Sequence, residues 1–297
     1  MSQYKRKLIA AICLIFAMLL VISAVGGQGA PFIPNGAHFP NPGGTSQTYS
    51  AVGRGIELTG PFFQNLGSNG RTCATCHQPG DGMSISAADV QQRFLLTQGQ
   101  DPIFRTVDGS NCNHNIDVST LAGKSDAYSL LRTRGLIRVA IAVPTTADYQ
   151  VMNSDNQYGC TDTNVISQYR RPLPTTNLRF LSAVMFDGRE SGPTGTSKIL
   201  PGFYPGSLLQ DLAHQSVDAT VIHAEGDGTR PTAAEQQEIV NFEMALFTAQ
   251  STGNGTGNLD ARGATGGPLP LVTQPFFISV NSSVNFLVST LELPGGR

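Results

Sequence analysis

The sequence predicts a mainly α fold in which helices are joined by long loops rich in glycine and proline. The 297 residues include 33 glycines and 18 prolines, which interrupt regular structure often. Four segments begin with a helix-capping residue, whereas only one apolar run is a good strand candidate. Hydrophobic residues make up 40% of the chain, enough to bury a core. The formal net charge of -2 offers no basic field, so we expect no nucleic-acid partner.

Residues 1–30 predict an export signal. Lys5-Arg6-Lys7 precedes an apolar run from Leu8 to Val25, and small residues follow. Because about 18 apolar residues can also span a bilayer, the segment is interpreted as a signal peptide or an N-terminal membrane anchor. We expect the protein to be exported to the periplasm, or tethered to the outer face of the inner membrane through residues 8–25.

Loops alternate with capped helices after this signal. Residues 31–50 consist mainly of Gly, Pro, Asn, Ser and Thr and predict a linker. Ser86 begins a capping box for the first helix, and Ser125 is the cap of a second. The apolar run 136–143, closed by a proline, predicts a strand, and its periodicity also allows a buried helical turn.

Two longer helices are predicted in the second half of the chain. Ser207 caps one of them, and Thr232 begins a capping box for the other, which is expected to end near Gln250. Before them, residues 178–186 predict a helix or an extended core segment. Residues 251–297 have no pattern that assigns an element and are treated as a poorly defined tail.

The segment Cys73-Ala74-Thr75-Cys76-His77 is a CxxCH motif. Its two thiols lie about one helical turn apart, so both can add to the vinyl groups on one edge of a porphyrin. The adjacent imidazole then lies under the iron. We therefore predict one covalent haem c, attached through Cys73 and Cys76, with His77 as the proximal iron ligand.

Two other uses of a CxxC pair fit this sequence less well. A structural zinc site needs two further ligands, normally as a second close pair, but Cys112 and Cys160 stand alone. A dithiol redox pair needs a βαβ context, which the glycine-rich approach to the motif does not give. In an oxidising compartment Cys112 and Cys160 predict a disulfide, with two separate buried thiols as the alternative.

The group on the other face of the iron decides between functions. A Met or His ligand gives a six-coordinate electron carrier, whereas an open position lets peroxide bind. The candidates in the sequence are Met83, Met152, Met185, Met244, His114, His214 and His223.

The residues around the motif, Gly67 to Pro79, resemble the bacterial di-haem cytochrome c peroxidases and their MauG-type relatives. Val184-Met-Phe-Asp-Gly-Arg-Glu190 resembles the family's Trp-Asp-Gly-Arg segment, and Leu212 to Glu225 resembles the distal helix that follows it. The resemblance covers residues 51–250. It implies that this range is a cytochrome c-like haem domain of the peroxidase type.

In that family a glutamine and a glutamate ten residues apart stand over the peroxide-binding haem, and Gln215 and Glu225 have this spacing. The resemblance implies that Gln215 hydrogen-bonds the bound oxygen and that Glu225 relays a proton during O–O cleavage. His223 is the alternative relay. The expected activity is reduction of hydrogen peroxide with electrons from an external donor, such as a small cytochrome.

Two departures from the family pattern bear on this activity. Phe186 occupies the place of the family's tryptophan, which removes an oxidisable indole from the electron path. The family's second CxxCH does not occur in the sequence, and residues 251–297 fit the start of a missing second haem domain. A shortened gene product, a single-haem descendant and a pseudo-enzyme all remain open. The alternative function is a mono-haem electron-transfer cytochrome without peroxidase activity.

Overall fold

The computed structural model describes residues 31–112, 116–181, 183–191 and 205–273. These residues combine helices with several antiparallel sheets, so the fold is mixed α/β and the predicted mainly α fold is wrong. One compact unit begins at Phe32. The predicted export segment, residues 1–30, lies outside the described residues. In the part of the chain that is described, no helix is both long enough and apolar enough to cross a membrane.

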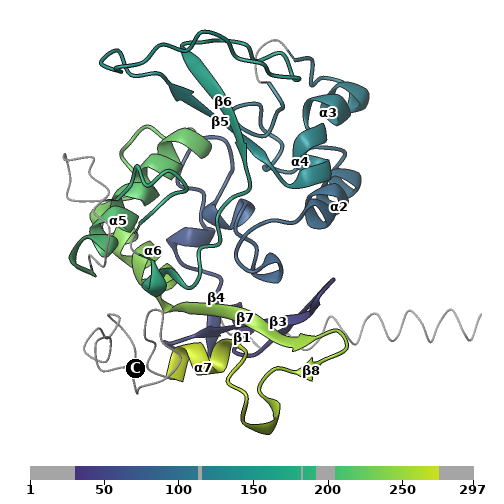
Figure 1. Ribbon diagram of the computed structural model, residues 1–297, viewed down its shortest axis with the longest axis vertical. Coiled ribbons are helices and arrows are strands. Elements are labelled where there is room, and N and C mark those ends of the chain that lie inside the picture. The colour runs from purple at the N-terminus through teal and green to yellow at the C-terminus, as the bar shows by residue number, and fades with distance from the viewer. Residues whose placement is uncertain (1–30, 113–115, 182, 192–204, 274–297) are drawn as a thin grey trace, which may run out of the picture. The chain divides into compact units, whose positions relative to one another are not determined.

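The main difference from the predicted helical fold is a four-stranded antiparallel sheet in the order β2-β3-β7-β8 (Figure 1). Strand β3, Gly44–Ser50, pairs along its length with β7, Leu246–Gly253. Strands β2, His38–Asn41, and β8, Gly257–Asn258, form its edges. The predicted linker at 31–50 is therefore mostly strand, and β3 within it pairs with residues about 200 positions away in sequence, as Thr48 does with Thr248.

The last predicted helix is shorter than expected, because strand β7 begins where its final turn was predicted. Helix α6, Ala233–Ala245, begins at the predicted capping box of Thr232 and Glu235 but ends before Gln250. From Leu246 the chain is extended, since residues 246–250 pair with β3. Tertiary pairing has overridden the helical pattern here.

The helices between these strands follow the sequence more closely. Helix α2, Ala87–Thr97, is capped by Ser86 as predicted. The second predicted helix is two short ones, α3, Leu121–Ala127, and α4, Ser129–Arg134, and its cap is Thr120 instead of Ser125. The remaining helices are α5, Pro205–His223, α7, Pro268–Thr273, and the short 3-10 turns η1, Pro61–Phe63, η2, Cys73–Thr75, η3, Pro79–Asp81, η4, Leu178–Phe180, and η5, Ala261–Gly263.

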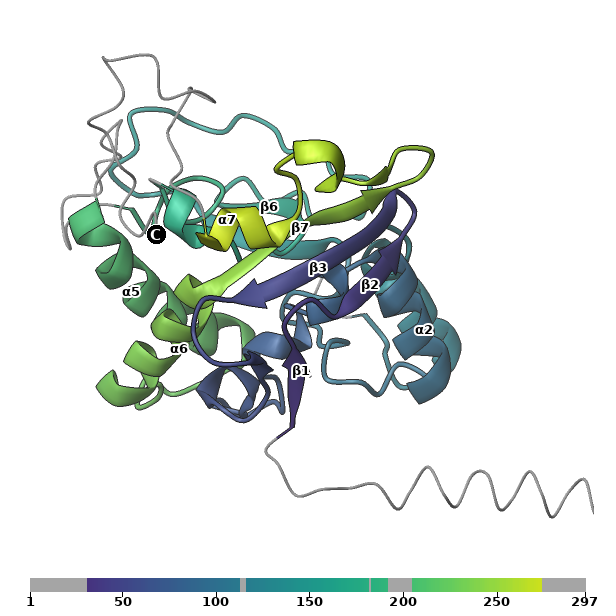
Figure 2. The same ribbon diagram turned by 90° about the horizontal axis from the view of Figure 1, so that it is seen from below.

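Two further strand pairs flank the helices. The predicted strand is confirmed as β5, Ile137–Ala142, which pairs with β6, Val165–Arg170. Strand β1, Phe32–Pro34, pairs with β4, Gly55–Glu57. Helix α7 packs on β7 and β3, as Figure 2 shows.

Buried apolar side chains form three clusters. The first joins α2, α4 and β5, the second joins β4, η1, α6 and β7, and the third joins η4, α5 and α6. Representative members are Val90, Phe94 and Leu131 of the first, Ile56, Phe62 and Ile239 of the second, and Leu208, Leu212 and Val240 of the third. Their meeting point is the cavity described below.

The predicted disulfide between Cys112 and Cys160 is confirmed, with a Cα–Cα distance of 5.6 Å and a sequence separation of 48. A closed loop of this length stabilises a protein by about 4 kcal/mol in the chain-entropy description.

We expect the double variant Cys112→Ser/Cys160→Ser to lose about that free energy of unfolding in urea titrations. Wild type under a reductant is the control and should match the double variant. A loss below about 1 kcal/mol would contradict the prediction.

Candidate haem-attachment site

The CxxCH motif begins with the single turn η2. Thr72 and Thr75 form a capping box around it, and the backbone N–H groups of Cys76 and His77 both donate to the carbonyl of Cys73. The turn brings the two thiols to the wall of one cavity, which His77 also lines. Both cysteines are free thiols in this structure.

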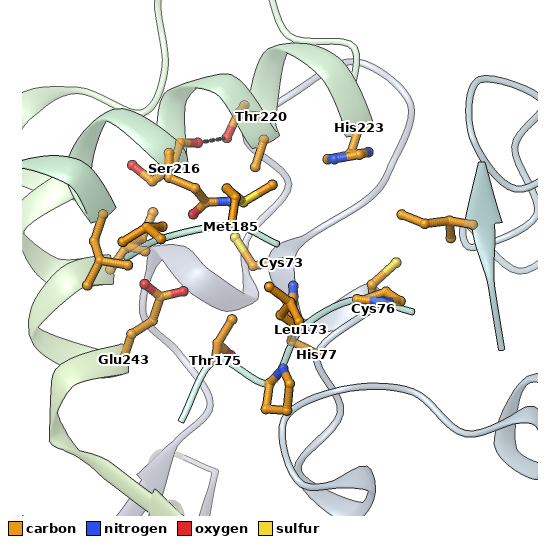
Figure 3. A pocket seen from close by; sticks show the side chains of 18 of the residues that line it. Cys73, Cys76, His77, Leu173, Thr175, Met185, Ser216, Thr220, His223 and Glu243 are labelled. Carbon is orange, nitrogen blue, oxygen red and sulfur yellow. Dashed lines mark hydrogen bonds between the residues drawn. The ribbon is translucent and has the colours of Figure 1, made fainter. Parts of the chain in front are cut away.

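The cavity lies where the three apolar clusters meet. Cys76 packs against the first cluster, Cys73 against the second and Met185 against the third. Its volume is about 210 Å³, whereas one water needs only roughly 10–15 Å³ on the same measure. Figure 3 shows how α5, α6 and the segment around Leu173 enclose it. The space suits a large, mostly apolar group.

The His77 ring is held in place through its Nδ1 atom. Its Nδ1 lies 3.0 Å from the carbonyl oxygen of Met83, and since a carbonyl can only accept, Nδ1 carries the proton. Burial lowers the pKa of His77 to about 4, against the opposing effect of the Met83 and Leu173 carbonyls. The ring is therefore neutral at pH 7, the form that binds iron.

Zinc and dithiol chemistry fit the motif less well. Cys112 and Cys160 are consumed by their disulfide, and among the described residues the one group of three metal-ligating side chains is Glu190, His214 and Asp218, away from the motif. Burial raises the pKa of Cys73 to about 12 and that of Cys76 to about 11. A redox-active dithiol needs a lowered thiol pKa. The residues present fit covalent haem attachment best.

A buried ionic network joins the motif to helix α5. Arg71 and Asp108 form an ion pair of 2.7 Å, with side chains 3% and 4% exposed. The Asp108 carboxylate lies 2.7 Å from Nδ1 of His223. Burial opposes the charge on Asp108, but the hydrogen bond from His223 and the Arg71 charge outweigh it and lower the pKa of Asp108. The carboxylate thus stays ionised and fixes the His223 ring at the cavity wall.

The predicted distal pair is not brought together. Gln215 lines the cavity from α5, but Glu225 is exposed. The helix ends at His223, and Glu225 adopts a left-handed conformation with φ 53° just beyond it, where its carbonyl accepts a hydrogen bond from Ser68. Of the two predicted relays, only His223 faces the cavity.

The candidate sixth ligands are also separated by the structure. Met185 and His223 line the cavity, Met83 and Met244 pack into the apolar clusters, Met152 is 82% exposed, His214 pairs with Glu190, and His114 lies outside the described residues. Met185 has a φ of 67°, which is unusual for this side chain. It is the best-placed thioether for a metal in the cavity.

Three arginines line one side of the cavity. Arg170 and Arg189 share the carboxylate of Asp187, at 3.4 and 3.0 Å, and Arg171 binds the carbonyl of Arg134. Phe186, which is 74% exposed, stacks under the Arg170 guanidinium at 4.8 Å. A cationic rim of this kind fits the two propionates of a haem.

Three residues of the site escaped the sequence analysis. Arg71 and Asp108 are 37 positions apart, and nothing in the sequence pairs them. Glu243 lines the cavity and is only 4% exposed. This burial raises the pKa of its carboxyl group to about 8. The sequence feature that could have identified Glu243 is a glutamate one turn after Ile239, on the apolar side of a predicted helix.

Comparison with protein-family models, with curated proteins and with solved structures finds no match to this chain. The resemblance to di-haem peroxidases therefore rests on the sequence motifs alone.

We expect Arg71→Ala to lower the free energy of unfolding by about 3–5 kcal/mol, because it leaves Asp108 buried without its cation. Urea unfolding measures this loss. The matched control is Arg105→Ala, since Arg105 is exposed and binds only the carbonyl of Asn69 among the hydrogen bonds described. That change should stay within about 1 kcal/mol. Equal losses in the two variants would show that the buried pair is not structural.

Proposed function

We propose that this chain is an exported c-type haem protein that reduces hydrogen peroxide with electrons from an external donor protein. The observation that carries the proposal is the cavity, which has a CxxCH on one wall and the His223–Asp108 pair on another. Cys73 and Cys76 would hold the haem and His77 would hold its iron. When bound, the haem supplies an iron that can bind peroxide and exchange electrons.

The chain's own residues support the proton transfers that peroxide reduction needs. Because Nδ1 of His223 donates to Asp108, its Nε2 is free to accept a proton and return it. The ionised Asp108 stabilises the imidazolium that forms. The Gln215 amide can donate a hydrogen bond to an oxygen in the cavity. This assigns to His223 the role that the sequence first suggested for Glu225.

We expect His223→Ala to lower peroxide turnover by about 10²- to 10⁴-fold, the usual loss when a general acid–base is removed. Turnover is measured by oxidation of a reduced cytochrome, with haem content checked by intact mass. His38→Ala is the control, since His38 lies exposed on β2. Equal turnover in wild type and His223→Ala would remove His223 from the relay. A six-coordinate low-spin spectrum in both redox states, without reaction with peroxide, would contradict the peroxidase proposal.

A second function is favoured by one observation, the placement of Met185 in the cavity. A thioether on the iron would make the protein a mono-haem electron carrier with a raised potential. Under the peroxidase proposal Met185→Leu leaves the optical spectrum unchanged. If the substitution instead converts a low-spin spectrum to a high-spin one, Met185 is the sixth ligand and the carrier function replaces the peroxidase.

A further inference from the structure

Glu243 is a buried acid that neither haem attachment nor the His223 relay uses. It lies on α6, and its Oε2 is buried without a hydrogen-bond partner among the described residues. Figure 3 shows its carboxyl group directed into the cavity, on a different side from His223. An unpartnered polar atom in an apolar site destabilises the fold, so its presence calls for a functional explanation.

No charge in the described part of the chain compensates Glu243. On the two helices that line the cavity, α6 contributes Ile239 beside Glu243, and α5 contributes one titratable residue, His223, among otherwise uncharged ones. Within the described residues, the other titratable or charged groups that line the cavity are Arg71, Cys73, Cys76, His77, Asp108, Arg170, Arg171, Arg189 and His223. Burial alone accounts for the raised pKa of Glu243, about 8. The carboxyl group therefore responds to any charge that the cavity gains or loses.

We propose that Glu243 is a redox-linked proton site, which takes up one proton when the haem cavity takes up one electron. The inference rests on the proposed haem attachment, and it holds for a peroxidase and for an electron carrier alike. The net positive charge of a ferric haem favours the carboxylate, and its loss on reduction favours the carboxylic acid.

The exchange balances in electrons and protons. With haem bound, an external one-electron donor protein would be oxidised as it reduced the iron, and a solvent proton would form an O–H bond on the Glu243 carboxylate. Reoxidation by one electron breaks that O–H bond and returns the proton to solvent. The net charge of the cavity is the same before and after, which avoids leaving an uncompensated charge in a medium of low dielectric constant.

The test is a potentiometric titration of the holoprotein, followed optically, at a series of pH values. We expect the midpoint potential to fall as pH rises, with a slope approaching about 59 mV per pH unit, because each unit is a tenfold change in proton activity. The slope should flatten above about pH 8, where the raised pKa of Glu243 lies. In Glu243→Gln the slope should be lost. Glu225→Gln is the matched control and should keep it, since Glu225 is exposed outside the cavity.

Infrared spectroscopy gives an independent readout. The reduced-minus-oxidised difference spectrum should contain the C=O band of a protonated carboxyl group, and Glu243→Gln should lack that band. Glu243→Leu is the second variant if the amide prevents folding. A holoprotein whose potential does not change with pH, or a slope that persists in Glu243→Gln, overturns this inference and leaves the haem proposal intact. Intact mass without haem overturns both, and absence of peroxide turnover alone overturns only the peroxidase.

Discussion

The buried ion pair between Arg71 and Asp108 is the interaction on which the candidate site depends. Two charges removed from water are tolerated only where their hydrogen-bonding groups are satisfied. Arg71 meets this condition by also donating to the carbonyls of Pro102, Ile103 and His223. One guanidinium therefore fixes three segments against each other: the approach to the motif, the 102–108 loop and the C-terminal end of α5. Gly67 brings the first and third still closer, since a Cβ there would lie 2.1 Å from the carbonyl oxygen of Ala224.

The parts of the fold that the sequence predicted are those set by local chemistry. The caps at Ser86 and Thr232 and the apolar run at 137–142 depend on neighbouring residues, and all three appear in the structure. The sheet of β2, β3, β7 and β8 was missed because its central pair, β3 with β7, joins residues about 200 positions apart, such as Thr48 and Thr248. No local pattern in a Gly- and Thr-rich segment distinguishes a linker from a strand whose partner is so distant.

The same division applies to the site. The CxxCH spacing predicted which three side chains would share a wall, because all three lie within five consecutive residues. The ten-residue spacing of Gln215 and Glu225 predicted less, since it crosses the end of α5, where the backbone turns away from the helix axis. Asp108 and Glu243 reach the cavity through tertiary packing. A charged residue on an apolar helix face, as at Glu243, is the one trace that such packing leaves in a sequence.

The charged groups are distributed unequally around the cavity, so its walls differ in the chemistry that they favour. Near His223 every charge has a partner, because Arg71 and His223 share Asp108. The rim holds Arg170, Arg171 and Arg189 against the carboxylates of Asp187 and Glu190, which leaves an excess of positive charge on that side. Among the described residues that line the cavity, the acid without a cation is Glu243 on α6. The rim would favour an anionic group on a bound cofactor, and the His223–Asp108 pair beneath α5 would favour proton transfer. A change of charge at the centre of the cavity would act most strongly on Glu243, which has no cation to hold it ionised among the described residues.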